Sequence, residues 1–294
     1  MSSISEFLQQ TVNGLVMGSS YVLTAFGLTM ILGMLDMINF AHGELLMMGA
    51  FVAVSLVIGL NLPYLVVIPI AIVIVSILGV IMERLAFRPL ENSDRVNLLV
   101  SSLGVSILLQ NGVQLIWGPD PRNLPSPFAN TQFTFAGAVL SGHRLFVVVV
   151  SLVLIGILYY VIQRTKLGIA MRSCAFDMET AKLMGIKART IIVMTFAIGS
   201  GLGAAAGILL APIFSVYPTM GVAATVKAFV VVLLGGIGNV TGAIAGGFTL
   251  GLVETYAAGY WSSEYKDVVA FLIMILVLLF KPEGLFGKNV QEKV

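Results

Sequence analysis

Long apolar stretches alternate with short polar ones along most of this sequence. A helix that crosses a membrane needs about 20 mostly apolar residues, and such stretches recur until close to the end of the chain. We therefore predict an all-α polytopic membrane protein with eight to ten transmembrane segments, some of them broken by glycine. The expected segments are residues 12–35, 45–60, 63–82, 97–117, 145–162, 191–211, 226–242, 243–260 and 268–280.

The longest charged interruption is residues 163–190, with six basic side chains against two acidic ones. Asp177 is placed to cap a short helix, because its carboxylate can accept hydrogen bonds from the free N–H groups of a first turn. Glu179 would lie in that turn, where the helix dipole favours a negative charge, and Gly185 would end the helix in the left-handed conformation. A helix this short needs a surface to dock against, so we predict a coupling helix presented to a partner at a membrane surface. Its apolar face would consist of Met178, Ala181 and Met184.

Residues 36–44 place three titratable side chains and an asparagine at or inside the boundary between two apolar segments. Such groups are costly in lipid and usually face a cavity or a partner. Asn39 is placed to cap the next helix, which would leave N–H groups directed at an anionic substrate. The alternative is a short interfacial turn in water, which position alone somewhat favours. The candidate pathway residues are Asn39, His42 and Glu44.

Residues 235–251 contain seven glycines, a pattern typical of close backbone approach or of a broken helix. We favour tight packing with a break in the helix. The segment is not a phosphate loop, because no Gly-Lys-Ser/Thr follows it. Residues 32–43 and 234–245 also share a pattern, which is either an internal repeat of the kind found in transporters or a chance likeness. The glycines of interest are Gly235, Gly236, Gly238 and Gly242.

Five further polar residues have simpler expected roles. Gln110, Asn111 and Gln114 lie in a predicted span, where at least one pair is expected to hydrogen-bond inside the helix bundle. Glu254 lies near a helix end and is expected to be solvated. His143 falls in the predicted outer loop with no evident ligand partner.

Composition supports the membrane class, since 58% of the residues are hydrophobic and only 10% are charged, against about 25% charged in soluble domains. The net charge of +2 gives no argument for nucleic acid as a partner. Cys174 is the single cysteine, so an internal disulfide is excluded and no metal site is expected. The first eleven residues carry no Lys or Arg, so a signal peptide is not expected. We expect one permease domain over residues 1–294.

The basic residues predict the orientation. Twelve of the sixteen lie in residues 83–97, in residues 163–190 or after residue 280. Cytoplasmic loops are enriched in Lys and Arg, so these three regions are predicted to be cytoplasmic. Residues 118–144, 212–226 and 261–267, together with the N-terminus, are then predicted to lie outside.

No nucleophile elbow, HExxH, Walker A or paired-carboxylate motif occurs in the sequence, so we predict transport without enzymatic chemistry and without a cofactor. An ion-coupled secondary transporter is one alternative, and it would use Asp36 or Glu44 as its membrane acid. A passive channel or scaffold is another, although it would not need a basic loop with a capped helix.

Three motifs resemble the LivH-type permease subunit of branched-chain amino acid ABC importers. Residues 38–44 read INFAHGE and resemble the signature of that family. Residues 234–243 resemble its glycine-rich segment. Residues 281–287 read KPEGLFG and resemble its closing segment, with Lys281 where the family has Arg.

A fourth motif, Glu179-Thr180-Ala181 followed by Gly185, resembles the EAA loop of ABC importer permeases, with Thr180 departing from the usual small residue. The resemblance implies partnership with a cytoplasmic ATPase dimer, a second homologous permease subunit and a periplasmic substrate-binding protein, within the bacterial inner membrane. It implies that residues 177–185 insert into a cleft of the ATPase. It also implies branched-chain or other hydrophobic amino acids as substrates, although related permeases carry urea, amides or other amino acids.

Overall fold

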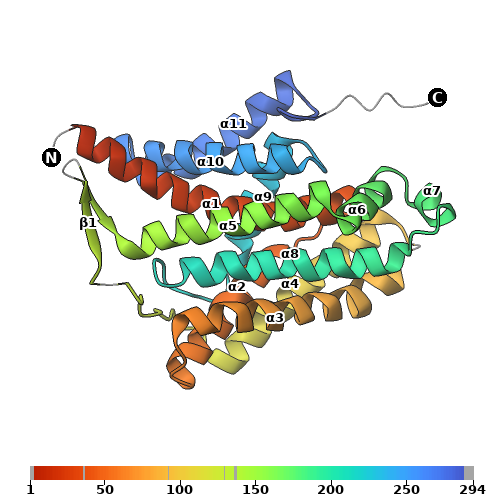
Figure 1. Ribbon diagram of the computed structural model, residues 1–294, viewed down its shortest axis with the longest axis horizontal. Coiled ribbons are helices and arrows are strands. Elements are labelled where there is room, and N and C mark those ends of the chain that lie inside the picture. Colours follow the sequence, from red (N-terminus) through yellow and green to blue (C-terminus); the bar gives the residue numbers. More distant parts are fainter. Residues whose placement is uncertain (1–2, 36, 92, 129, 136–137, 288–294) are drawn as a thin grey trace.

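The computed structural model describes residues 3–287 apart from positions 36, 92, 129, 136 and 137. Asp36, Lys288 and Lys293 therefore lie outside the described residues. Most of the described chain is helical, and several long helices run along the longest axis of the molecule (Figure 1). The predicted all-α membrane class is confirmed.

The elements follow one another in a simple order. The first part of the chain forms α1 (Ser3–Leu35), α2 (His42–Val54), the π-helical turn η1 (Ser55–Gly59), α3 (Tyr64–Met82), the turns η2 (Glu83–Phe87) and η3 (Arg88–Leu90), and α4 (Arg95–Trp117). Next come β1 (Gln132–Phe135), β2 (Ala138–Ser141), α5 (Gly142–Arg164), α6 (Lys166–Phe176) and α7 (Met178–Leu183). The last part forms α8 (Ala188–Leu210), α9 (Met220–Gly235), α10 (Val240–Tyr260), η4 (Ser263–Tyr265) and α11 (Lys266–Phe280).

Six helices in the described chain are long and apolar enough to cross a membrane, or seven if the bent pair of α9 and α10 counts as one span. This is fewer than the eight to ten predicted segments. The difference arises because α9 has 16 residues and α11 has 15, so each falls short of a full crossing of about 20 residues. The break between α9 and α10 also lies nearer to Gly235 than the predicted boundary at residue 242, and the pair bends by 120°.

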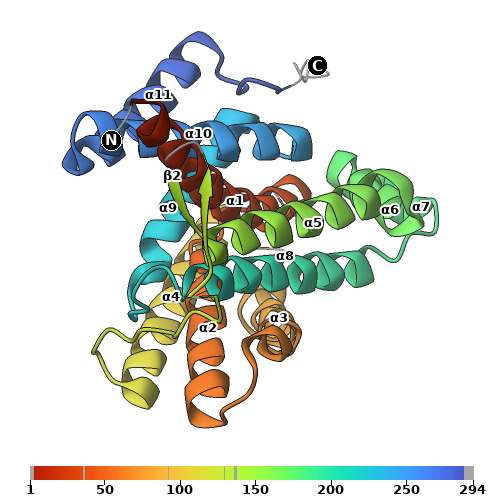
Figure 2. The same cartoon turned by 60° about the vertical axis from the view of Figure 1, so that its left-hand side comes forward.

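Helices α1 and α8 form the centre of the bundle and are mostly buried, whereas α3, α4 and α5 expose most of their residues. Figure 2 shows α10 and α11 on one side of α1, with α2, α3 and α4 on the far side of α8. The central helices approach closely because small residues meet there. A Cβ built on Gly27 of α1 would lie 2.7 Å from Cα of Gly199 in α8, so no larger residue fits at Gly27.

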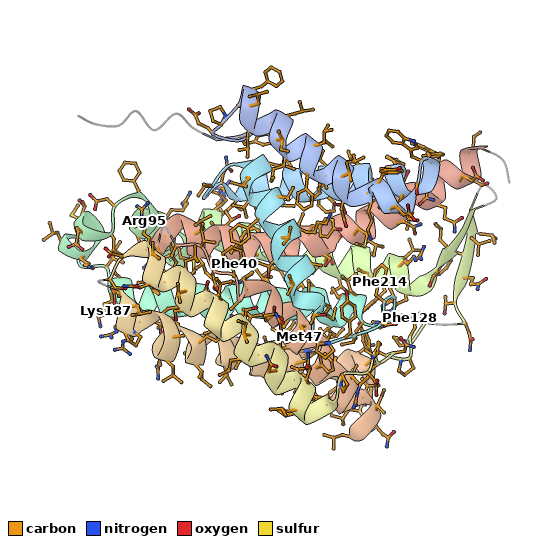
Figure 3. All side chains as sticks on the ribbon, turned by 180° about the vertical axis from the view of Figure 1, so that it is seen from behind. Phe40, Met47, Arg95, Phe128, Lys187 and Phe214 are labelled. Atoms are coloured by element: carbon orange, nitrogen blue, oxygen red, sulfur yellow. The ribbon has the colours of Figure 1, made fainter. Side chains whose placement is uncertain are left out.

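The two ends of the molecule differ in charge. One end carries the N-terminus and the hairpin, and the other carries α6, α7 and the C-terminal end (Figure 1). Arg95 and Lys187 lie at the second end, opposite Phe128 and Phe214 (Figure 3). The segments predicted to be cytoplasmic thus share one end, and the N-terminus shares the other end with the predicted outer loops. Which end faces the cytoplasm stays a prediction.

The loop predicted to lie outside, residues 118–144, contains strands that the sequence analysis did not anticipate. Strands β1 and β2 pair antiparallel, with Gln132 opposite Ser141. Arg122 and Val216 exchange backbone hydrogen bonds of 2.8 and 2.7 Å, which join this loop to the α8–α9 connection. The sequence pattern that could have predicted this strand is the alternation of Gln, Phe, Thr and Phe in β1.

Candidate functional site

The segment between α1 and α2 turns into the interior of the helix bundle. His42 begins α2, and its Nε2 donates to the carbonyl oxygen of Thr24, 3.0 Å away. Thr24 lies eleven residues before Leu35, the end of α1, which corresponds to about 16 Å of helix. Figure 3 places Phe40 and Met47 between the two ends of the molecule, so α2 starts inside the bundle and not at one of its ends.

The three candidate pathway residues Asn39, His42 and Glu44 are each fully buried, with 0% of the residue surface exposed. An interfacial turn in water, which position alone favoured, is therefore wrong. The Glu44 carboxyl accepts hydrogen bonds from Ser106 Oγ at 2.9 Å and from Gln110 Nε2 at 2.8 Å, both on α4. Gln110 thus bonds to Glu44 rather than to a neighbouring amide of its own helix. The structural hydrogen bond expected of Gln110 exists, and its partner is a candidate site residue.

Asn39 does not cap α2. Its Oδ1 accepts from the backbone N–H of Ala41 at 3.0 Å, and the N-cap position, Ala41, has no side-chain cap. A residue far along the chain takes that role, because Thr225 Oγ1 on α9 accepts from the backbone N–H of Gly43 at 3.0 Å. The sequence analysis missed Thr225, and no local pattern could have indicated a cap that comes from another helix.

Each candidate pathway residue leaves one buried polar atom without a hydrogen-bond partner in the described part of the chain. These atoms are Asn39 Nδ2, His42 Nδ1 and Glu44 Oε2. Buried polar atoms are almost always paired, and in a membrane interior an unpaired one is costly. Three of the eight such atoms found among the described residues fall within the six positions 39–44, where water or a ligand would satisfy them.

The short helix predicted between Asp177 and Gly185 forms, as α7, while its coupling role stays a prediction. Asp177 caps α7, with its Oδ1 accepting from the N–H groups of Glu179 and Thr180 at 3.0 and 3.1 Å. The hydrogen bond from the Thr180 hydroxyl is the largest cause that holds the pKa of Asp177 below its usual value. Gly185 has φ +84°. The N–H groups of Gly185 and Ile186 bond back to the carbonyls of Lys182 and Ala181, each at 3.0 Å, which is the Schellman arrangement.

The predicted apolar face of α7 divides between two environments. Ala181 is buried and Met178 packs against the core, whereas Met184 is 81% exposed, because it lies beyond the last helical residue, Leu183. Phe176 and Leu183 are exposed beside it, at 92% and 87%. A hollow of about 440 Å³ lies between α6 and α7. Helix α6 was not predicted, and with it the described coupling region becomes a two-helix unit.

Cys174 lies in α6 and is buried, with 2% of its surface exposed. Burial raises the pKa of its thiol, and a buried thiol reacts slowly because the thiolate is the nucleophile. The native cysteine is therefore a poor probe of membrane sidedness.

Comparison with known proteins identifies the family. The family model described as branched-chain amino acid transport system / permease component matches residues 10–278. The chain belongs to this family. It is 42% identical to the high-affinity branched-chain amino acid transport system permease protein BraD of Pseudomonas aeruginosa, over 100% of both chains. It is 41% identical to the permease protein LivH of Escherichia coli (strain K12), over 98% of both. It is 31% identical to the probable branched-chain amino acid transport permease protein LivH of Methanocaldococcus jannaschii, over 90% of this chain and 88% of that one.

The glycine-rich segment of this permease is a turn against which the closing motif packs. Gly236 and Gly238 have φ of +96° and +74°, so the chain reverses where L side chains would be strained. Gly235 and Gly242 pack closely across the turn, since a Cβ on Gly242 would lie 2.0 Å from the Gly235 carbonyl oxygen. The predicted packing with a break is confirmed.

The closing motif is tied to this turn by two hydrogen bonds. The N–H of Leu285 donates to the carbonyl of Leu234 at 2.8 Å, and the side-chain amide of Asn239 donates to the carbonyl of Phe286 at 2.6 Å. Asn239 also caps α10, through its Oδ1 and the N–H of Gly242. Two motifs that are separate in the sequence therefore form one structure.

Two expectations about single polar residues of the permease are wrong. Glu254 is 4% exposed rather than solvated, because it pairs with Lys227 and accepts from the Tyr21 hydroxyl at 2.6 Å. Lys227 also contacts Asp267 at 2.7 Å. His143 lies in the first turn of α5, buried, with Nε2 3.1 Å from the Leu209 carbonyl oxygen. The sequence offered no local sign of these partners, which come from other helices.

Proposed function

We propose that this chain is the membrane-spanning subunit of an ATP-driven importer in the bacterial inner membrane. It would translocate branched-chain or other hydrophobic amino acids that a periplasmic binding protein delivers. The observation that carries the proposal is the family match over residues 10–278, together with full-length relatives named as high-affinity branched-chain amino acid permeases. A second homologous permease subunit would complete the pathway, and a cytoplasmic ATPase dimer would supply the energy.

The ATPase would contact α6 and α7. Exposed Phe176, Leu183 and Met184 offer an apolar contact surface at the end that also carries the basic segments. Exposed apolar side chains gathered in this way are typical of an interaction site. The cap at Asp177 and the C-terminal turn at Gly185 fix both ends of α7, so the short helix can transmit force rather than unwind.

Substrate would pass beside the buried group Asn39, His42 and Glu44. Their three unpaired polar atoms favour a hydrated or ligand-facing role over a sealed core. The chemistry is binding and release, not covalent change. The ion-coupled alternative is the less favoured one, because the relatives named above are permease components of amino acid transport systems. Urea, amides and other amino acids remain the alternative substrates.

The test is reconstitution of the chain with the ATPase subunits, partner permease and binding protein that the proposal requires. We expect uptake of labelled leucine that requires both ATP and the binding protein. Transport by this chain alone on an ion gradient would favour a secondary transporter. Uptake of urea or an amide in preference to leucine would refute the proposed substrate but would leave the proposed ATP-driven importer standing.

A separate variant tests whether α7 couples ATP hydrolysis to transport. Gly185→Val forces a β-branched residue into a left-handed position at a local cost of about 1–2 kcal/mol. We expect normal insertion, with loss of uptake and of substrate-stimulated ATP hydrolysis together. Gly156→Val is the matched control, because Gly156 lies on the exposed face of α5 with nothing within 4 Å of an added Cβ. Wild-type rates for both variants would remove α7 from the coupling mechanism.

A further inference from the structure

A cavity of about 280 Å³ lies near the end of the molecule that carries the N-terminus. It is walled by α1, the first turn of α5, the α8–α9 connection, α10 and the start of α11. Its size is close to the lower limit of small-molecule sites, about 300 Å³. Phe214 lies on its wall, and Figure 3 shows Phe214 toward the hairpin end of the molecule. The cavity is separate from the group formed by Asn39, His42 and Glu44.

Arg144 is the cation that faces this cavity from α5. It is half-buried, and its guanidinium donates to Asn13 Oδ1 of α1. Among the described residues, no carboxylate lies within 4 Å of the Arg144 guanidinium. Arg144 also borders a second cavity of about 370 Å³. A partly buried cation without a counter-charge is costly, and a guanidinium fork matches a carboxylate.

The acidic group on the cavity wall is only partly neutralised. Glu254 borders the cavity, and Lys227 and the Tyr21 hydroxyl each donate to one of its two oxygens, but Lys227 also contacts Asp267. Lys266, a second cation, borders the cavity from the start of α11 and is exposed. Glu254, Asp267 and Lys227 together keep one net negative charge, and Arg144 and Lys266 add two positive ones. The cavity therefore offers a cation for a carboxylate and, beside Glu254, a residual negative charge for an ammonium group.

The rest of the wall combines amide and apolar surface. Gln10 adds a second side-chain amide next to Asn13, and Val16, Met17 and Ile213 add hydrophobic contacts. We propose that this cavity is a binding site of the permease for a small apolar α-amino acid, whose carboxylate pairs with Arg144 and whose side chain contacts Val16, Met17 and Ile213. This inference rests on the proposed function, because that function supplies the class of ligand. It adds a first binding step, before the ligand reaches the buried group near α2.

The binding test uses the complete transporter in lipid nanodiscs without its binding protein, and a photoreactive diazirine analogue of leucine as the probe. We expect the label on α1 or on residues 213–214, with excess leucine preventing it. Leucinamide, which lacks the carboxylate, should not prevent it. Arg144→Gln should reduce labelling at least tenfold. Arg122→Gln is the matched control, because it removes the same charge from an exposed residue of the outer loop and should leave labelling unchanged.

A second variant keeps the test decisive if Arg144→Gln assembles poorly. Ala258→Trp fills the cavity from α10 without touching the cation, and it too should abolish labelling. Labelling that persists in assembled Ala258→Trp, lies elsewhere in the chain or is blocked equally by leucinamide overturns the inference. Wild-type leucine uptake by assembled Arg144→Gln at limiting substrate overturns it as well, with the proposed function intact. If the wild-type complex imports no leucine at all, the proposed function fails and this inference fails with it.

Discussion

Replacing Glu44 tests whether the buried polar group serves transport or only the fold. Glu44→Ala removes an acceptor that two α4 side chains share, at 2.9 Å from Ser106 Oγ and 2.8 Å from Gln110 Nε2. Interhelical hydrogen bonds in membrane proteins contribute about 0.6–1.7 kcal/mol each. The loss of both predicts a fall of about 1–3 kcal/mol in the free energy of unfolding, before any contribution from the cavity left behind.

Glu44→Gln separates the two roles, because an amide oxygen can still accept from both donors. We expect its free energy of unfolding to stay within about 1 kcal/mol of wild type. The amide nitrogen would turn the unpaired acceptor, Oε2, into a donor on the proposed pathway, and we expect uptake to fall about tenfold, equivalent to about 1.4 kcal/mol. The assays are denaturant unfolding in nanodiscs and leucine uptake in proteoliposomes.

The control for both variants is Asn111→Ala, which removes an exposed amide from α4, the helix that carries Ser106 and Gln110. It should change neither stability nor uptake appreciably. Wild-type uptake by Glu44→Gln, combined with instability of Glu44→Ala, would show that the group only holds α2 to α4. Equal stability of Glu44→Ala and Asn111→Ala would refute the hydrogen-bond argument itself.

Three further predictions concern the orientation in the membrane, the buried ion pair of Lys227 and the cap of α7. In a Cys174→Ser background, a membrane-impermeant maleimide should label Thr134→Cys of the hairpin in intact cells, and should label Leu183→Cys of α7 only after the membrane is opened; the reverse pattern would invert the orientation. Lys227→Met leaves Glu254 buried without its cation, so the free energy of unfolding should fall by about 3–5 kcal/mol, and adding Glu254→Gln should recover part of that loss. Because the pKa of Asp177 is lowered in the fold, its cap is complete above the ordinary aspartate pKa of about 3.9 and is lost only as pH falls through the lower folded value. Stimulated ATP hydrolysis should therefore not change between pH 6 and 8 through this group, and Asp177→Asn, which also caps helices, should retain hydrolysis that Asp177→Ala loses.

Local signals explain what the sequence predicted well. The cap at Asp177 and the left-handed turn at Gly185 each depend on residues within one helical turn. The local sequence alone was therefore enough to predict them. A break within residues 235–251 was also indicated, because few residues other than glycine adopt positive φ cheaply, although the predicted boundary fell at residue 242 and not at Gly236 and Gly238. The clustering of basic residues placed residues 83–97 and 163–190 at one end of the molecule, as the structure has them.

Contacts between distant helices explain what was missed. Glu44 meets Ser106 and Gln110, which lie 62 and 66 positions away, and Glu254 meets Lys227 at 27 positions. No periodicity encodes such pairs, so Glu254 was expected to be solvated and residues 36–44 to resemble an interfacial turn. The segment count was too high for a related reason, because apolar length alone does not distinguish a full span from the shorter α9 and α11.

Helix α8 provides the physical link between the coupling helix and the proposed pathway. Only four residues separate the end of α7 from Ala188, the start of α8, and the turn at Gly185 is closed by its own hydrogen bonds. Displacement of α7 is therefore expected to move the start of α8 directly.

At its other half, α8 contacts α2 almost backbone to backbone. A Cβ on Gly49 would lie 2.5 Å from Cα of Ala204, and one on Gly207 would lie 1.9 Å from the carbonyl oxygen of Leu46. No layer of flexible side chains separates the two helices there, and a packed interior transmits strain because it is hardly compressible. Since α2 begins at His42 and carries Glu44 in its first turn, a shift of α8 should reach the buried polar group without passing through a loop. This is why α7, although at the far end of the molecule from the proposed amino acid cavity, is well placed to control the pathway between them.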